Sequence, residues 1–269
     1  NDGGEIMFRV VLAELRKLRR PTLVLGTLGA ALFFSALITS FLFLLIDDPD
    51  GNGDRGRQIG REVLTLASGS VTGFSSVGGL LGIIALCVFA AQTAQEYTYG
   101  TLRNLLVRQS GRLRILGGKL IANTIFAGVM VLFSAVVSIG ISVALAPGAK
   151  VSTDLWFTSD GWSSIIHTII NVFIAVFGFG VFGMALGLLL RSPISSISVG
   201  VLWILIIENL LGAVKESALR WLPGSQLNTI AEGGSETISY SHAMQVGGAY
   251  VIAISIIAAV LFSRRDVAN

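Results

Sequence analysis

Charged side chains are scarce in this chain, and their scarcity excludes most soluble folds. Of the 269 residues only 13% are Asp, Glu, Lys or Arg, whereas soluble domains have roughly 25%. Hydrophobic residues make up 53%, and the mean hydropathy is +0.77. With a single cysteine, Cys87, the chain can form no intrachain disulfide and no cysteine-based metal cluster. The two histidines, His167 and His242, are far apart in sequence and form no metal-ligand motif.

In place of charged residues, the sequence contains long apolar runs. Each is long enough for a helix to cross a bilayer core of about 30 Å, and none shows the alternation of a transmembrane strand. We therefore predict an all-α integral membrane protein with six spans. The runs are approximately 22–46, 72–92, 120–146, 164–190, 194–213 and 244–263. Residues 21–269 would form the transmembrane domain, and residues 1–20 would form a separate N-terminal segment. Within the transmembrane domain, residues 47–71 and 214–243 would form large outer loops.

The distribution of positive charge along the chain predicts how the chain is oriented in the membrane. Most of the 19 Lys and Arg residues lie before the first run, between the second and third runs, and after the last run. Because positively charged loops stay in the cytoplasm, we expect both termini to be cytoplasmic.

The N-terminal segment has an amphipathic pattern. Its apolar residues follow helical spacing opposite a basic face, and Pro21 then ends the pattern. This predicts an interface helix ahead of the first span, although a charged flank that only fixes topology is the alternative. The apolar set is Phe8, Val11, Leu12, Leu15 and Leu18, and the basic set is Arg9, Arg16, Lys17 and Arg20.

The polar stretch "EYTYGTLRNLLVRQSGRLRILGGKL", Glu96 to Leu120, separates the second and third runs. Gly100 should interrupt a helix there, Thr101 is a plausible N-cap, and Leu102, Leu105 and Leu106 make a short apolar stripe. We expect an exposed cytoplasmic segment, residues 93–119, that docks onto another protein. An ordinary basic loop whose arginines only hold the topology fits the spacing equally well.

This stretch resembles the segment after the second span of bacterial ABC-2 type transporter permeases. The matching residues are Glu96, Tyr97, Gly100, Thr101, Leu102, Arg103 and Lys119, and a later "RWLPG", Arg220 to Gly224, matches as well. In that family the segment forms a coupling helix seated on a separate nucleotide-binding subunit. The resemblance implies that this chain is the permease subunit of an exporter in the bacterial plasma membrane.

The resemblance also implies an assembly of two permease chains, as a homodimer or heterodimer, and two ATPase chains that bind ATP and Mg. The coupling residues would be Glu96, Tyr97, Gly100, Thr101, Leu102, Arg103, Leu105, Leu106 and Arg108. The chain itself has no Walker A loop, because "GGKL" lacks the required Ser or Thr. We therefore expect this chain to have no enzymatic activity and to bind no cofactor, metal or nucleic acid. We expect it to contact membrane lipids.

Three further features carry expectations. Glu208 is an acid inside the fifth run, which is costly unless it has a partner, and we expect His167, with Asn171 one turn further on, to supply one. These residues would form a substrate path or outer gate. The alternatives are a structural hydrogen bond, or a Glu208 carboxylate that reaches water at the outer interface. The Gly78/Gly82 and Gly183/Gly187 pairs predict close helix packing, with a hinge as the alternative.

The outer loop 215–241 predicts a short surface helix followed by a polar turn. A self-contained secondary transporter or channel is the alternative function. Such proteins usually show repeats and several intramembrane charges, and here we find one such acid and no convincing repeat.

Overall fold

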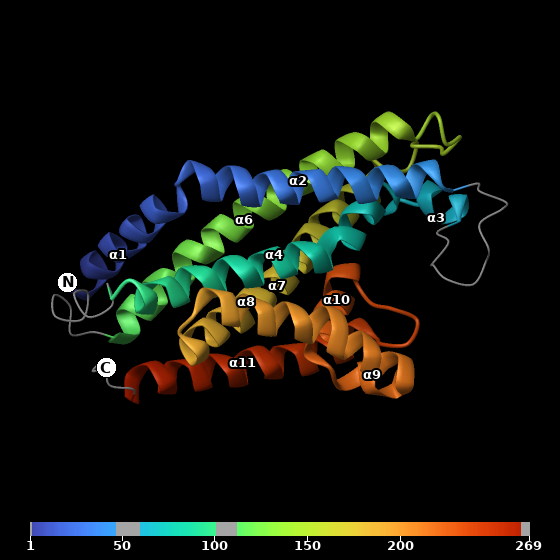
Figure 1. Cartoon of the computed structure of the whole chain (residues 1–269). Helices are drawn as coiled ribbons and strands as arrows, with labels where there is room; N and C mark the ends of the chain where they lie inside the picture. Colours follow the sequence, from blue (N-terminus) through green and yellow to red (C-terminus); the bar gives the residue numbers. More distant parts are fainter. Residues whose placement is uncertain (1, 47–59, 101–111, 265–269) are drawn as a thin grey trace.

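The computed structural model describes residues 2–46, 60–100 and 112–264, and throughout these ranges the regular structure is helical. Figure 1 shows long helices running side by side along one direction. Six of them are long and apolar enough to span a membrane, which confirms the all-α, six-span prediction. The spanning helices are α2 (Pro21–Leu44), α4 (Gly69–Thr98), α6 (Arg112–Leu145), α7 (Ser159–Leu190), the α8–α9 segment (Pro193–Val214) and α11 (Tyr240–Arg264).

Shorter helices complete the chain. The α1 helix (Asp2–Leu18) precedes the first span, and α3 (Arg61–Thr65) precedes the second. The fifth span is α8 (Pro193–Leu202), a π-helical turn (Trp203–Ile207) and α9 (Glu208–Val214). A 3₁₀ turn (Glu216–Trp221) and α10 (Pro223–Glu232) then lead towards α11.

The centre of the bundle is the contact between α4 and α7, which contribute Phe74, Leu81, Phe89 and Phe179 to the core. Glycines bring these two helices together. A Cβ atom added to Gly183 would lie 2.1 Å from the carbonyl oxygen of Leu86, and one added to Gly82 would lie 2.1 Å from the Phe179 ring. The helix-packing interpretation of these glycines is therefore confirmed.

The α10 helix is a feature that the sequence analysis missed. The predicted surface helix is present as the 3₁₀ turn, which has no buried residue, but α10 follows it and enters the bundle. Glycines of the neighbouring helices make room for α10. A Cβ atom at Gly78 would lie 2.6 Å from Ala231, and one at Gly178 would lie 2.6 Å from Leu227. Local sequence does not reveal this site, because the space is provided by residues far away in the chain.

The helices that flank the predicted coupling segment are longer than the apolar runs. The α4 helix continues past Gln92 to Thr98, and α6 already begins at Arg112. Much of the segment expected at 93–119 is therefore helix, and only 99–111 lie between the two. Hydropathy located the apolar part of each helix, but polar residues such as Gln95 and Glu96 continue a helix as readily as they end it.

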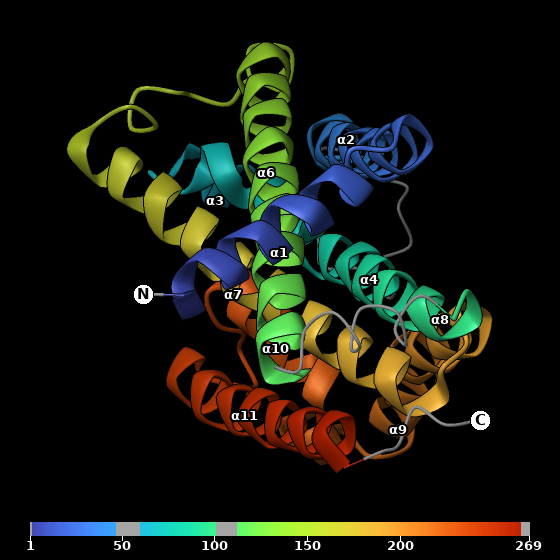
Figure 2. The same cartoon turned by 90° about the vertical axis from the view of Figure 1, so that its left-hand side faces the viewer.

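Both ends of the described chain lie at one end of the bundle. Figure 1 shows α1 and the C-terminal end of α11 at the same end, opposite α3 and α10. Figure 2 shows α1 crossing α6 there. The inward side of α1 is Val10, Glu14 and Leu18, whereas Phe8 and Leu12 of the predicted apolar face are exposed. Gly118 allows the crossing to be close, because a Cβ atom there would lie 2.6 Å from Val10.

Candidate functional site

The last turn of α4 presents Glu96 to the interior of the bundle. Tyr99 caps the helix, and Gly100 follows with a φ of +64°, a left-handed conformation that glycine adopts at little cost. The expected helix break at Gly100 is thus confirmed. Glu96, however, lies before the break and is only 7% exposed. Our expectation that it belongs to an exposed segment was wrong, because α4 continues six residues past its apolar run and α1 and α6 enclose Glu96 there.

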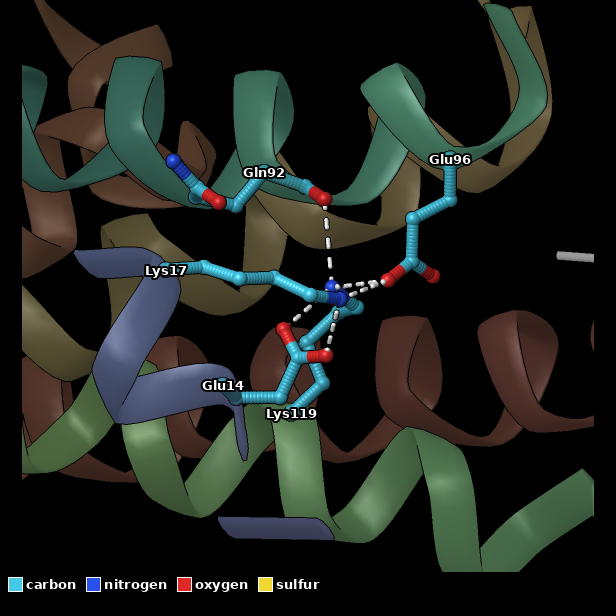
Figure 3. A network of polar contacts seen from close by, with 5 residues as sticks. All are labelled: Glu14, Lys17, Gln92, Glu96 and Lys119. Carbon is cyan, nitrogen blue, oxygen red and sulfur yellow. Dashed lines mark hydrogen bonds and ion pairs between the residues drawn. The ribbon is translucent and has the colours of Figure 1, made fainter. Parts of the chain in front are cut away.

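Glu96 belongs to a network of four charged side chains from three helices (Figure 3). The α1 helix contributes Glu14 and Lys17, α4 contributes Glu96, and α6 contributes Lys119. The Lys119 ammonium lies 2.8 Å from Glu14 Oε2 and 2.9 Å from Glu96 Oε1. Lys17 pairs with the same two carboxylates, with Nζ 2.9 Å from Glu96 Oε1. We call these four residues the ion-pair network.

A backbone carbonyl completes the coordination of Lys119, which donates to Gln92 O at 3.2 Å. Lys119 is 3% exposed and Glu14 is 5% exposed, so both charges are largely removed from water. The network is neutral, because its two ammonium groups balance its two carboxylates. Removing one partner from such a buried set typically costs about 3–5 kcal/mol, since the remaining charge stays buried without compensation.

The two α1 members have perturbed pKa values. Burial by itself would raise the pKa of Glu14, but the charge and hydrogen bond of Lys119, with those of Lys17, hold it below its ordinary 4.5. Burial would likewise lower the pKa of Lys17, but Glu14 and Glu96 raise it above its ordinary 10.5. Both shifts favour the charged forms, so the network stabilises the docked α1 over a wide pH range.

Sequence reasoning found only part of this site. Glu96 and Lys119 were named through the family resemblance, whereas Glu14 and the backbone of Gln92 were missed, and Lys17 was assigned to a solvent-facing basic side. The available signal was Glu14 itself, an acid three residues before Lys17 on a basic helix. Helical spacing places these two residues together but does not reveal that α4 and α6 meet them.

Other predicted coupling residues have different surroundings. The Tyr97 ring lies under the guanidinium of Arg191, 5.4 Å from its centroid, so it contacts the connection between α7 and α8. Residues Thr101, Leu102, Arg103, Leu105, Leu106 and Arg108 lie outside the described residues.

Glu208 has partners other than the one we expected. Its Oε1 accepts from the Trp203 indole and from the backbone N–H of Gly224, both at 2.9 Å, and its Oε2 accepts from the N–H of Ser225 at 2.9 Å. The carboxyl group thereby caps the N-terminus of α10, where backbone N–H groups have no intrahelical acceptor. A π-helical turn holds more residues than an α-helical one, which helps to bring Trp203 to the same side as Glu208.

The expected Glu208–His167 contact is therefore wrong. His167 lies within 3.5 Å of Ser163 Oγ on its own helix, α7. Asn171 accepts a hydrogen bond from the Tyr240 hydroxyl at 2.8 Å and so joins α7 to α11. The structure does not bring the three residues together, because α10 occupies the position next to Glu208. Pro223 and Gly224 of "RWLPG" begin α10, and Gly224 leaves room for the carboxyl group, since a Cβ there would lie 2.8 Å from Glu208 Oε2.

Among the residues that the structure describes, no group of three or more His, Cys, Asp and Glu side chains is placed to hold a metal ion.

The sequence from residue 60 to residue 268 matches a protein family described as "Protein of unknown function (DUF2705)". The chain belongs to the DUF2705 family. The matched region contains Glu96, Lys119 and Glu208, whereas α1 and α2 precede it. The ion-pair network thus joins the DUF2705 region to a helix that lies before it. A search of curated proteins found no match.

The ion-pair network predicts how the docking of α1 depends on pH. A fluorophore on Ala13→Cys, in a Cys87→Ser background, should keep a constant anisotropy between about pH 5 and 10. Because the folded pKa of Glu14 is lowered, its contribution is lost as the pH falls below 4.5. The contribution of Lys17 is lost as the pH rises above 10.5. At both extremes the anisotropy should fall as α1 is released.

The matched control carries the label on Val136→Cys, an exposed position of α6, to report any global unfolding. In a Glu14→Gln variant the acid transition at Ala13 should disappear. An acid transition that persists unchanged in Glu14→Gln would show that another group holds α1.

The environment of Glu208 predicts a specific coupling. Glu208→Gln should lower the free energy of unfolding by about 1–3 kcal/mol, because an amide NH₂ cannot accept from the donors that now face a carboxylate oxygen. In thermal unfolding experiments, a double-mutant cycle with Trp203→Phe should be non-additive and one with His167→Ala additive. Equal coupling energies in the two cycles would contradict the assignment.

Proposed function

We propose that this chain is the membrane-spanning permease subunit of an ABC-2 type ATP-binding cassette transporter that works as an exporter. It pairs with a second permease chain in the bacterial plasma membrane, with both termini in the cytoplasm. Separate nucleotide-binding subunits hydrolyse ATP and bind to the segment between α4 and α6. The proposal rests on the resemblance of residues 96–120 to the coupling segment of that family.

The observation that supports it most strongly is the anchoring of both helices that enter this segment. Glu96 lies four residues before Gly100 on α4, and Lys119 lies in the first turns of α6. Their side chains pair at 2.9 Å, and both pair with Glu14 or Lys17 of α1. A force applied to the segment would therefore move α1, α4 and α6 together instead of fraying the helix ends.

From α4 the movement can reach the rest of the bundle. The glycine contacts of α4 with α7 bring backbone against backbone at Gly183 and Leu86, which leaves little room for one helix to slide past the other. Tyr97, at the end of α4, also contacts Arg191 at the end of α7. In the proposed mechanism α4 is thus the element that transmits ATP-driven closure.

Glu208 receives a structural role in this proposal. Three donors occupy its carboxylate oxygens, so we do not place it in the substrate path. A secondary transporter would need intramembrane charges that are available to an ion. Within the described residues of the six apolar runs, Glu208 is the only acid, and its capping of α10 favours the ABC-2 proposal over that alternative.

The test is site-specific crosslinking in native membranes. In a Cys87→Ser background, a crosslinker on Arg103→Cys should capture a nucleotide-binding subunit. The same crosslinker on Asp154→Cys, at the opposite end of the bundle, should not. The copurified complex should hydrolyse ATP, and the chain alone should not. Robust turnover by the isolated chain, or capture from both positions alike, would contradict the proposal.

A further inference from the structure

A polar cavity of about 360 Å³ lies beside the ion-pair network, where α1 turns into α2 and faces the end of α4. Its walls come from all three helices. The lining residues are Lys17, Arg20, Thr22, Leu23, Gln92, Gln95, Glu96 and Tyr99.

The cavity has one positive charge in excess. Lys17 and Glu96 are already balanced within the neutral ion-pair network, whose other members are Glu14 and Lys119. Arg20, in contrast, has no acidic partner among the described residues and is exposed at the turn before Pro21. An arginine with free donors beside a polar cavity favours an anion that can accept several hydrogen bonds.

A side-chain amide adds a second, independent indication. The side chain of Gln92 lines the cavity, the residue is 7% exposed, and its amide makes no hydrogen bond to the described part of the chain. Figure 3 shows this side chain pointing away from the two ammonium groups. Its N–H group is therefore available to donate to a ligand oxygen that enters the cavity.

The location of the cavity identifies the source of such an anion. Arg20 and Thr22 flank the first residue of a membrane-spanning helix, and the apolar side chain of Leu23 also lines the cavity. This is the depth at which phospholipid headgroups lie, with acyl chains continuing along the span. We propose that the cavity binds the phosphate group of an anionic membrane phospholipid through Arg20, Gln92 and the exposed side of Lys17.

The inference differs from the proposed coupling role and does not depend on it. A bound phosphate would contact the same Lys17 that pairs with Glu14 and Glu96, so the lipid would reinforce the docking of α1. It would do so whether or not the chain assembles with an ATPase.

The test measures lipid-dependent thermal stability of the full-length chain in detergent. Phosphatidylglycerol should raise the melting temperature in a saturable way. Arg20→Gln should weaken its apparent affinity about tenfold, because it removes charge-assisted hydrogen bonds. Gln92→Leu, which leaves the charge unchanged, should also weaken it. Arg19→Gln is the matched control, since Arg19 is an exposed neighbour that does not line the cavity, and it should retain the wild-type affinity.

Two further ligands distinguish the source of the phosphate. Inorganic phosphate at millimolar concentration and phosphatidylcholine should each give a much smaller shift than phosphatidylglycerol. A shift from inorganic phosphate that equals that of the lipid would overturn the lipid assignment in favour of a soluble anion. Equal weakening by Arg19→Gln and Arg20→Gln would overturn the site itself and leave only general attraction between a basic surface and anionic lipid.

Discussion

Two carboxylates and two ammonium groups meet where α1, α4 and α6 come together, and much of this structure depends on keeping them paired. Lys119, Glu14 and Glu96 are each less than 10% exposed. Separating any one of them from its partners would leave a buried charge without compensation, which costs free energy. Each helix therefore has a fixed position relative to the other two. Because α1 crosses α6 at Gly118, the backbone packing agrees with the charge pairing.

The buried carboxyl groups of Glu96 and Glu208 are stabilised in two different ways. Glu96 is balanced by ammonium groups from other helices, which ties three segments together at one end of the bundle. Glu208 is satisfied by an indole and two backbone N–H groups, which attach α10 to the fifth span towards the other end. Between these sites the glycine contacts of α4 and α7 form the connection, so the two ends are joined through a closely packed core.

The sequence predicted the parts of the fold that depend on composition and local spacing. The six apolar runs correspond to the six spanning helices, the helix break occurs at Gly100, and the glycine pairs lie at helix contacts. These features depend on the length of each apolar run, on the backbone freedom of glycine and on side-chain size, and all three can be read from a single sequence.

What the sequence could not predict depends on contacts between distant segments. Glu96 was expected to be exposed because its apolar run ends at Gln92, and only the arrangement of α1 and α6 shows that it is enclosed. Glu208 was assigned to His167 by estimated depth, but α10 lies beside it instead. The space for α10 comes from glycines as far away as Gly78, Gly178 and Gly247, a relation that local periodicity does not contain.

Hydrogen–deuterium exchange of α1 in a Lys119→Met variant tests the central claim most directly. Methionine keeps much of the length of the side chain but removes the more deeply buried of the two ammonium groups that join Glu14 and Glu96, leaving Lys17 alone to balance both carboxylates. Amide protection should fall from residue 10 to residue 18 and in the last turn of α4, while α7 and α10 remain protected as in the wild type. Lys215→Met, at an exposed lysine, should change nothing. Unchanged protection of α1 in Lys119→Met would contradict the claim that the ion-pair network holds α1, α4 and α6 together.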